Sequence, residues 1–193
     1  MKLPIVRYGH PVLRAKGKQI TKVDDWIREL AANMLETMQE AHGVGLAAQQ
    51  VGEALQLTVI DIAGAEDQAS TMTLNGTEVE PKGSMPLVLL NPKLTLGRET
   101  GIAVEGCLSF PEITGDIRRA ISVVLRAETP EGEPLEIEAS GLLARVLQHE
   151  VDHLNGILFI DRMSAATKVA LRSRLKRMQR ETAQGLGVEA LKG

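Results

Sequence analysis

The chain has 193 residues, with 22 Lys or Arg against 25 Asp or Glu and a formal net charge of -3. Its single cysteine excludes an internal disulfide, and with it the small secreted proteins that disulfides hold together. The lack of a basic excess argues against a general nucleic-acid-binding protein and predicts no direct DNA binding. A chain of this length can bury a core without a metal ion. A metal site in it is therefore expected to serve chemistry rather than folding.

Targeting signals are absent from the sequence pattern. No apolar run reaches the roughly 18 residues that a membrane-spanning helix requires. The first seven residues, MKLPIVR, contain a Pro and an Arg where a signal peptide would have its apolar core. The sequence therefore predicts a cytoplasmic protein of bacterial type, with a reduced thiol and no membrane contact. Since repeats, linkers and low-complexity segments are also lacking, we expect one catalytic domain over residues 1–193.

Three segments have the apolar spacing of helices. Residues 24–41 carry one apolar stripe, in which the pattern includes Trp26. Residues 142–154 are apolar around most of their circumference, which is typical of a buried helix. Residues 164–183 combine a few apolar positions with many Arg and Lys, so we expect a C-terminal helix with a solvated basic face.

Strands are expected between the first two helices. The segments with strand-like apolar patterns are residues 55–62, 86–91, 94–99, 121–128 and 134–139. Segment 63–85 is polar and predicts an inserted loop or a hairpin that turns at Asn75-Gly76. The order of elements predicts an α+β fold, with mixed or antiparallel sheets around the central helix and one helix at either end of the chain. Residues 185–193 are expected to form a flexible tail.

The central helix contains His149-Glu150-Val151-Asp152-His153, a match to the H-E-x-x-H metal-binding pattern. Residues four apart lie on one helix face, so both imidazoles reach one metal ion. Glu150 lies about 100° round the helix from His149, where it can act on a water molecule without being a ligand. Two histidines merely packed in a core would each need a hydrogen-bond partner, which makes that alternative weaker.

A catalytic metal site needs a third protein ligand. No His follows His153, and the only glutamates after it are Glu181 and Glu189. Upstream lies Cys107, in the sequence EGCLS, and a thiolate is a strong ligand for Fe or Zn. A lone cysteine is more often an inert buried side chain. Beside an incomplete metal site, however, Cys107 is the better candidate for the third ligand.

A third cluster, GVGLAAQQ at residues 43–50, follows the first helix. It lacks the sequence of a phosphate-binding loop. Its small residues would let a substrate lie against the backbone, and a Gln amide there could donate to a developing oxyanion. By itself this cluster is weak evidence, because Gly-rich turns often follow helices.

Together the three clusters resemble the motifs of the peptide deformylase family, G-x-G-L-A-A-x-Q, E-G-C-L-S and H-E-x-x-H, in the family's order and without a mismatch. The likeness extends from Pro11 to about Arg162. Members of this family remove the formyl group from N-formylmethionyl nascent chains and release formate. The resemblance implies one divalent metal ion on Cys107, His149 and His153. It implies Fe2+ as the usual ion, with Zn2+, Ni2+ or Co2+ able to replace it.

The resemblance also implies roles for the other residues of the site. Glu150 would be the acid and base, and Gln50 and the backbone N–H of Leu108 would hold the oxyanion. The substrate-binding residues would be Val44, Gly45, Ser109, Leu142 and Val146. Arg145 lies on the same helix face as this pocket, and we expect its head group to swing out of any apolar pocket. The partners would be nascent N-formyl-Met peptides bound by a monomer, and a ribosome contact of the basic C-terminal helix is a further hypothesis.

Two alternatives remain open. A zincin-type metallopeptidase shares the H-E-x-x-H helix but takes its third ligand downstream, where this chain offers no His. A non-catalytic metal-binding or ribosome-binding homologue would have no use for a base such as Glu150 beside a metal ion. Cleavage of an unblocked peptide would favour the first alternative, and absence of formate release would favour the second.

Overall fold

The computed structural model describes residues 1–65 and 69–186. Its helices are α1 (Asp25–Glu40), α2 (Gly141–Leu154) and α3 (Ala165–Gly185), with the 3-10 helices η1 (Pro11–Arg14), η2 (Ala48–Val51), η3 (Lys82–Ser84) and η4 (Phe159–Arg162). Its strands are β1 (Gly45–Ala47), β2 (Leu57–Ile60), β3 (Met72–Leu74), β4 (Thr77–Val79), β5 (Leu87–Leu96), β6 (Thr100–Gly106), β7 (Thr114–Ala120), β8 (Ser122–Glu128) and β9 (Pro134–Ser140).

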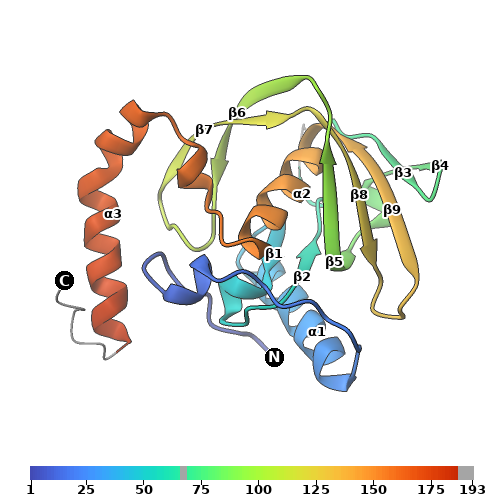
Figure 1. Ribbon diagram of the computed structural model, residues 1–193, viewed down its shortest axis with the longest axis horizontal. Helices are drawn as coiled ribbons and strands as arrows, with labels where there is room; N and C mark the ends of the chain where they lie inside the picture. Colours follow the sequence, from blue (N-terminus) through green and yellow to red (C-terminus); the bar gives the residue numbers. More distant parts are fainter. Residues whose placement is uncertain (66–68, 187–193) are drawn as a thin grey trace.

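A large and a small antiparallel sheet surround α2. The large sheet has seven strands in the order β1-β2-β5-β8-β9-β3-β4, and β6 pairs with β7 in a separate two-stranded sheet. Figure 1 shows α2 in the middle of the molecule, between the small sheet and the curved large sheet. Leu143, Ala144 and Leu147 of α2 are buried in the main hydrophobic core with residues of the large sheet. The predicted α+β fold, with a central helix between an N-terminal and a C-terminal helix, is confirmed.

Helix α1 closely matches the predicted segment 24–41. Asp24 caps its first turn, since the side chain accepts a hydrogen bond from the N–H of Ile27 at 3.0 Å. Its buried face is formed by Ile27, Leu30, Ala31, Met34 and Met38. The expectation that Trp26 belongs to this apolar face is wrong, because its side chain is 51% exposed. Trp26 lies about 100° from the centre of the buried face, which a count of apolar residues at helical spacing does not reveal.

The strands β2, β8 and β9 lie within or close to the predicted segments 55–62, 121–128 and 134–139. The predicted hairpin in segment 63–85 is formed by β3 and β4. Its two turn residues, Asn75 and Gly76, have positive φ angles of 50° and 80°, as a tight two-residue hairpin turn requires.

Strand β5 corrects the prediction of two separate strands at 86–91 and 94–99. The structure has one strand, and its register against β8 shifts between Leu90 and Lys93. Asn91 has a φ of 51° at this irregularity, and its side-chain amide bonds both backbone groups of Ile20. The Asn-Pro pair at 91–92 therefore marks a β-bulge and does not end the strand.

The sequence pattern does not predict β1, β6 and β7. β1 has three residues and was interpreted as part of a Gly-rich turn. β6 and β7 contain Gly101, Gly106 and Gly115, and they lack a regular alternation of apolar and polar residues. Their pairing joins the chain on both sides of residues 107–113, the loop that contains Cys107.

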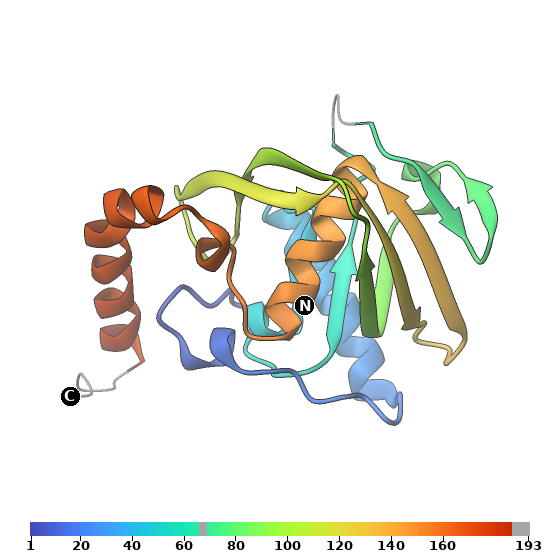
Figure 2. The same ribbon diagram turned by 45° about the horizontal axis from the view of Figure 1, so that its top comes forward.

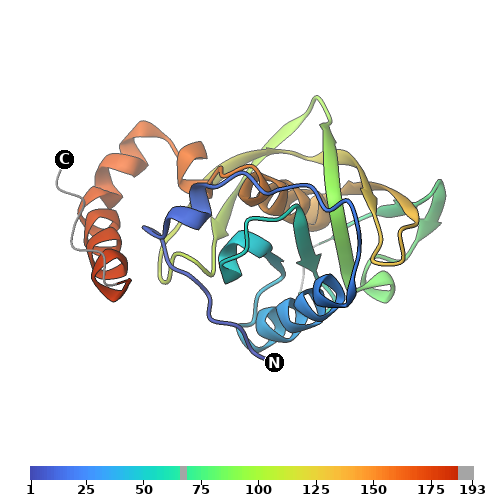
Figure 3. The same cartoon turned by 60° about the horizontal axis from the view of Figure 1, so that its bottom comes forward.

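The N-terminal segment connects loops that are distant in the sequence. The N–H of Val6 donates to the carbonyl of Gln50 at 2.9 Å, and the N–H of Tyr8 donates to the carbonyl of Ser109 at 2.9 Å. Figure 3 shows this segment passing beside η2. The hydroxyl of Thr182 in α3 donates to the Tyr8 carbonyl at 2.9 Å, so the C-terminal helix rests on the same segment.

Helix α3 is confirmed at the predicted position, and the hydroxyl of Ser164 caps its first turn by accepting from Thr167 N–H. Figure 1 and Figure 2 place α3 at the end of the molecule opposite the β3–β4 hairpin. Of the predicted flexible tail at 185–193, residues 187–193 lie outside the described residues, and Gly185 still belongs to the helix. Within the described part of the chain, no helix combines the length and the hydropathy that a membrane crossing demands.

Candidate active site

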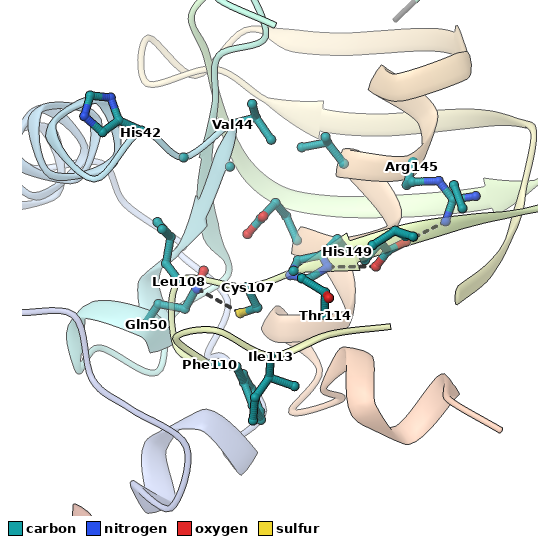
Figure 4. Close-up of a pocket in the computed structure, with 18 of the residues that line it drawn as sticks. His42, Val44, Gln50, Cys107, Leu108, Phe110, Ile113, Thr114, Arg145 and His149 are labelled. Carbon is teal, nitrogen blue, oxygen red and sulfur yellow. Dashed lines mark hydrogen bonds and ion pairs between the residues drawn. The ribbon is translucent and has the colours of Figure 1, made fainter. Parts of the chain in front are cut away.

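The three sequence clusters meet around one cavity of about 850 Å³. The segment at 43–50 contributes β1 and η2, the EGCLS motif contributes the end of β6 and the loop after it, and α2 contributes His149 and Glu150. Figure 4 shows Gln50, Cys107 and His149 next to one another in this cavity. Three clusters that are about fifty residues apart in the chain therefore form one site.

Three side chains of the site have the arrangement of metal ligands. The ligand atoms of Cys107, His149 and His153 lie within 4.8 Å of one another. The Sγ atom of Cys107 is 3.3 Å from Nε2 of His153, and the two imidazole rings have centroids 5.0 Å apart. One thiolate and two imidazoles form a donor set that suits Zn, Fe and related divalent ions. The residues present thus fit a divalent metal ion.

Glu105 orients the first of these histidines, a role that the sequence did not reveal. Its Oε2 atom is 3.0 Å from Nδ1 of His149, which leaves Nε2 of the ring for a metal ion. The carboxylate is buried and also accepts two hydrogen bonds from Arg119, at 2.9 and 3.0 Å. Burial alone would raise the pKa of Glu105, but the contacts with His149 and Arg119 outweigh it and hold that pKa well below its usual range.

The same contacts change the protonation of both histidines. Burial lowers the pKa of His149, but hydrogen bonds with Cys107 and Glu105 and the charges of Cys107 and Glu150 outweigh it and raise the pKa to about 10. Burial, together with the neighbouring charge of His149, lowers the pKa of His153 well below its usual value. A neutral His153 is ready to act as a ligand, whereas a metal ion must displace a proton from His149.

Glu150 has the environment expected of an acid and base. Its side chain is buried, and its Oε2 atom has no hydrogen-bond partner among the described residues. Burial raises the pKa of Glu150, and the nearby charges of His149 and Arg119 lower it. Burial has the larger effect, so the pKa rises to about 7. A carboxyl group with this pKa can both accept and donate a proton near neutral pH.

Gly45 leaves the space that the Glu150 carboxylate occupies. A Cβ atom at Gly45 would lie 2.3 Å from Oε1 of Glu150, far inside van der Waals contact. We expect Gly45→Ala to displace the carboxylate and to lower kcat by about 10²-fold, because such losses follow from a misplacement of about 1 Å. Steady-state kinetics would measure this. Gly64→Ala, where a Cβ meets nothing within 4 Å, is the matched control, and equal activity of the two variants would contradict the prediction.

Gln50 is held with its amide NH2 group toward the thiol. Its Oε1 atom accepts from the N–H of Ala47 at 2.9 Å, which fixes the orientation of the amide. Its Nε2 atom lies 3.5 Å from Sγ of Cys107 and 3.4 Å from Oγ of Ser109. The donor end of the amide therefore lies beside the cluster of Cys107, His149 and His153.

The residues expected to bind substrate do not all face the cavity. Val44, Gly45, Leu142 and Val146 line it. Ser109 is fully buried behind Gln50, and its carbonyl accepts from Tyr8, so it is placed to support the amide of Gln50 rather than to touch a substrate. The cavity lining also includes His42, to which the sequence pattern assigns no role, and residues of β6, a strand that the pattern does not predict.

Arg119 connects the metal site to the C-terminal end of α2. Its guanidinium is buried, pairs with Glu105 on one side and also donates to Asp152, which Arg162 contacts in turn. We expect Arg119→Met to lower the free energy of unfolding by about 3 kcal/mol, because it leaves two buried carboxylates short of a partner. Urea denaturation would measure the loss. Arg126→Met removes an exposed ion pair to Glu136 and should cost less than about 1 kcal/mol, so losses of equal size would contradict this account.

Comparisons with known proteins give one consistent result. The sequence profile of the family described as Polypeptide deformylase matches residues 2–169. A peptide deformylase of Opitutus terrae is 47% identical, over 94% of this chain and 95% of its own length. One of Methylacidiphilum infernorum is 44% identical, over 93% and 94% of the two chains.

Solved structures agree with the sequence relatives. A plant peptide deformylase superposes with a TM-score of 0.84 at 35% identity, over 99% of this chain and 96% of the other. The enzyme from Thermotoga maritima has a TM-score of 0.73 at 39% identity, over 85% and 99% of the two chains. These matches, with the Cys107, His149 and His153 cluster in place, show that the chain belongs to the polypeptide deformylase family and is a metal-dependent hydrolase that removes N-formyl groups.

Proposed function

We propose that the cavity binds the N-formylmethionyl end of nascent peptides and that Glu150, Gln50 and the backbone N–H of Leu108 carry out the hydrolysis. The observation that carries this proposal is the convergence of a buried, proton-accepting carboxyl group and a fixed amide donor on one thiolate and two imidazoles. Formyl peptides are the substrates that membership of the family implies.

We propose that Cys107, His149 and His153 hold one ion of Fe2+, which Zn2+, Ni2+ or Co2+ can replace. The donor set suits all four ions, and the resemblance to the family favours iron. When bound, the divalent ion supplies a Lewis acid that polarises the formyl carbonyl and makes a water molecule more acidic. Glu105 would keep the ring of His149 directed at the ion through the bond to Nδ1.

Glu150 would move the proton. It takes a proton from the attacking water as the oxygen of that water adds to the formyl carbon. It then gives the proton to the amine nitrogen as the carbon–nitrogen bond breaks. The products are formate and a peptide with a free amino terminus. A pKa of about 7 suits both halves of this cycle near neutral pH.

Gln50 and the N–H of Leu108 would stabilise the oxyanion. The amide of Gln50 cannot easily rotate away, because Ala47 holds its oxygen and Ser109 supports its nitrogen. A donor fixed in this way stabilises the charge that develops in the transition state, and one such donor typically contributes roughly 3–4 kcal/mol. Gln50 would therefore be a catalytic residue rather than a binding residue.

The two strands that border the cavity suit an extended peptide. β1 is one of the two edge strands of the large sheet, and β6 pairs only with β7 among the described strands. Both strands line the cavity, β1 with Gly45 and the preceding Val44, and β6 with residues 103–106. A peptide can pair its backbone with a free strand edge. The methionine side chain would then lie against Leu142 and Val146.

Further partners follow from the surface and the substrate. We expect the protein to be cytoplasmic, because nascent formylated chains are found in the cytoplasm. We also expect it to be a monomer. Helix α3 buries none of its residues and carries many Arg and Lys, which supports the hypothesis of a ribosome contact. Replacement of Arg172, Lys176 and Arg180 by Glu should weaken cosedimentation with ribosomes at low salt. Unchanged binding would refute that hypothesis without affecting the proposed chemistry.

Product analysis separates the proposed function from that of a peptidase. Mass spectrometry of formyl-Met-Ala-Ser after incubation should show intact Met-Ala-Ser as the only peptide product. Acetyl-Met-Ala-Ser should remain uncleaved, since the formyl carbon carries only hydrogen and a close-fitting site excludes the extra methyl group. Cleavage between Met and Ala would instead support the peptidase alternative.

A further inference from the structure

Arg145 links α2 to both strands of the small sheet. It lies one turn before His149, and its side chain is only 16% exposed. Its Nη1 atom donates to Oε1 of Glu105 at 2.7 Å and to the carbonyl of Ile117 in β7 at 3.0 Å. Its Nη2 atom donates to the carbonyl of Gly101 in β6 at 3.1 Å. Figure 4 shows Arg145 and His149 joined to opposite sides of one carboxylate. Arg145 is among the residues that line the cavity, and its head group is bonded within the protein by all three of these contacts.

The small sheet is joined to α2 through β7 as well, where Gln148 bonds both backbone groups of Ala120 and Asp152 accepts from Arg119. It is not hydrogen-bonded to the large sheet. Ile102 and Val104 on the outer face of β6 are 57% and 66% exposed, so no core anchors that face of the strand. The edge of β6 toward the cavity is the one that an extended peptide would meet. The position of this edge therefore depends on the pairing of β6 with β7 and on the contacts that α2 makes with β6 itself, through Glu105 and Arg145.

Neutralising Glu105 does not account for Arg145. Glu105 already accepts two hydrogen bonds from Arg119 and contacts His149. Two of the three hydrogen bonds of Arg145 go to backbone carbonyls, one in each strand of the small sheet. These two bonds hold the strands against α2, together with the contacts of Gln148 and Arg119, and contribute nothing to the charge of Glu105.

We propose, on the basis of the function proposed above, that Arg145 is a positioning residue that holds the free edge of β6 beside α2 and so determines how tightly the residues after formyl-methionine bind. Without the guanidinium, β6 would move relative to α2 and lose backbone hydrogen bonds to the peptide. The methionine side chain and the formyl group would be affected little, because Val44 lies next to β1, and Leu142 and Glu150 belong to α2. Arg145 thus affects the binding of the peptide residues that follow the methionine, and it does not affect the chemical step.

The test compares a long and a short substrate on one variant. Arg145→Met keeps an unbranched stem against the cavity and removes the guanidinium. We expect its KM for formyl-Met-Ala-Ser to rise about tenfold, the effect of losing one or two hydrogen bonds, with kcat within about twofold. Its KM for formyl-methionine amide, which has no residue after the methionine, should stay within about twofold. Arg126→Met, at an exposed position on β8, should change neither value.

An equal rise in KM for both substrates would show a merely structural role for Arg145 and would overturn the proposal. An unchanged KM for both substrates would overturn it as well. Metal content and urea denaturation of each variant would be measured in parallel. If Arg145→Met does not fold, Arg145→Lys takes its place, with an expected KM increase of about threefold that is again confined to the tripeptide. If the unmodified protein releases no formate from either substrate, the proposed function itself fails, and the proposal for Arg145 fails with it.

Discussion

Replacement of Glu150 by Gln is expected to leave the metal site loaded and to lower kcat by about 10²–10⁴-fold, the usual contribution of a positioned acid and base. Gln has the shape of Glu but cannot take a proton from water. The buried position of Glu150 and its pKa of about 7 are the reasons for expecting so large an effect. Formate release and metal content would be measured on the same preparation.

Glu112→Gln provides the control for that experiment. Glu112 also lines the cavity, but its side chain is 87% exposed. We expect activity within about twofold of the unmodified protein. If Glu150→Gln deformylates formyl-Met peptides as fast as this control, Glu150 is not the acid and base.

Replacement of Cys107 by Ala is expected to lower metal affinity by more than about a hundredfold. Loss of a residue that only supports a ligand typically costs 10–100-fold, and Cys107 is placed as a ligand itself. The fold should persist, because its hydrophobic core does not depend on a metal ion. Elemental analysis after dialysis would give the metal content, and the cobalt-substituted protein should lose its sulfur-to-metal absorption band.

His42→Ala is the matched control for the cysteine variant. His42 lines the cavity but is not part of the ligand cluster, so it should leave metal content unchanged. If Cys107→Ala retains one tightly bound ion per chain, the third ligand is another residue. The distinction from zincin-type peptidases would then lose its main support, since it rests on a thiolate in the third position.

The sequence predicts the helices of this fold better than its strands. α1 and α2 repeat apolar residues at helical spacing over four turns, so the signal is long and tolerates the misassigned Trp26. β1 has only three residues, and β6 is interrupted by Gly101 and Ala103, so neither shows a period of two. Their pairing depends on partners elsewhere in the chain, which local pattern does not contain.

The site was predictable where residues are close in sequence. The i, i+4 spacing of His149 and His153 is sufficient to place two imidazoles together. The contact of Glu105 with His149 depends instead on how β6 packs on α2, and a charged residue in a strand gives no sign of it. Glu105 lies two residues before Cys107, and that proximity was the one signal that could have identified it.

The sequence places Arg145 on the helix face of the pocket but does not reveal its partners. Its apolar neighbours on that face predict only that the head group swings out of an apolar pocket. The structure shows an ion pair with Glu105 and two backbone carbonyls. A strand that the pattern did not predict provides two of these acceptors, so sequence reasoning had no means of finding them.

Formate release from formyl-Met-Ala-Ser, assayed anaerobically on protein of known metal content, tests the central claim most directly. Anaerobic conditions protect the Cys107 thiolate from oxidation. We predict catalytic formate release that depends on the bound metal, is lost on its removal and returns when Fe2+ or Co2+ is added. A metal-loaded protein that releases no formate, or that cuts the peptide chain and leaves the formyl group in place, would contradict the account.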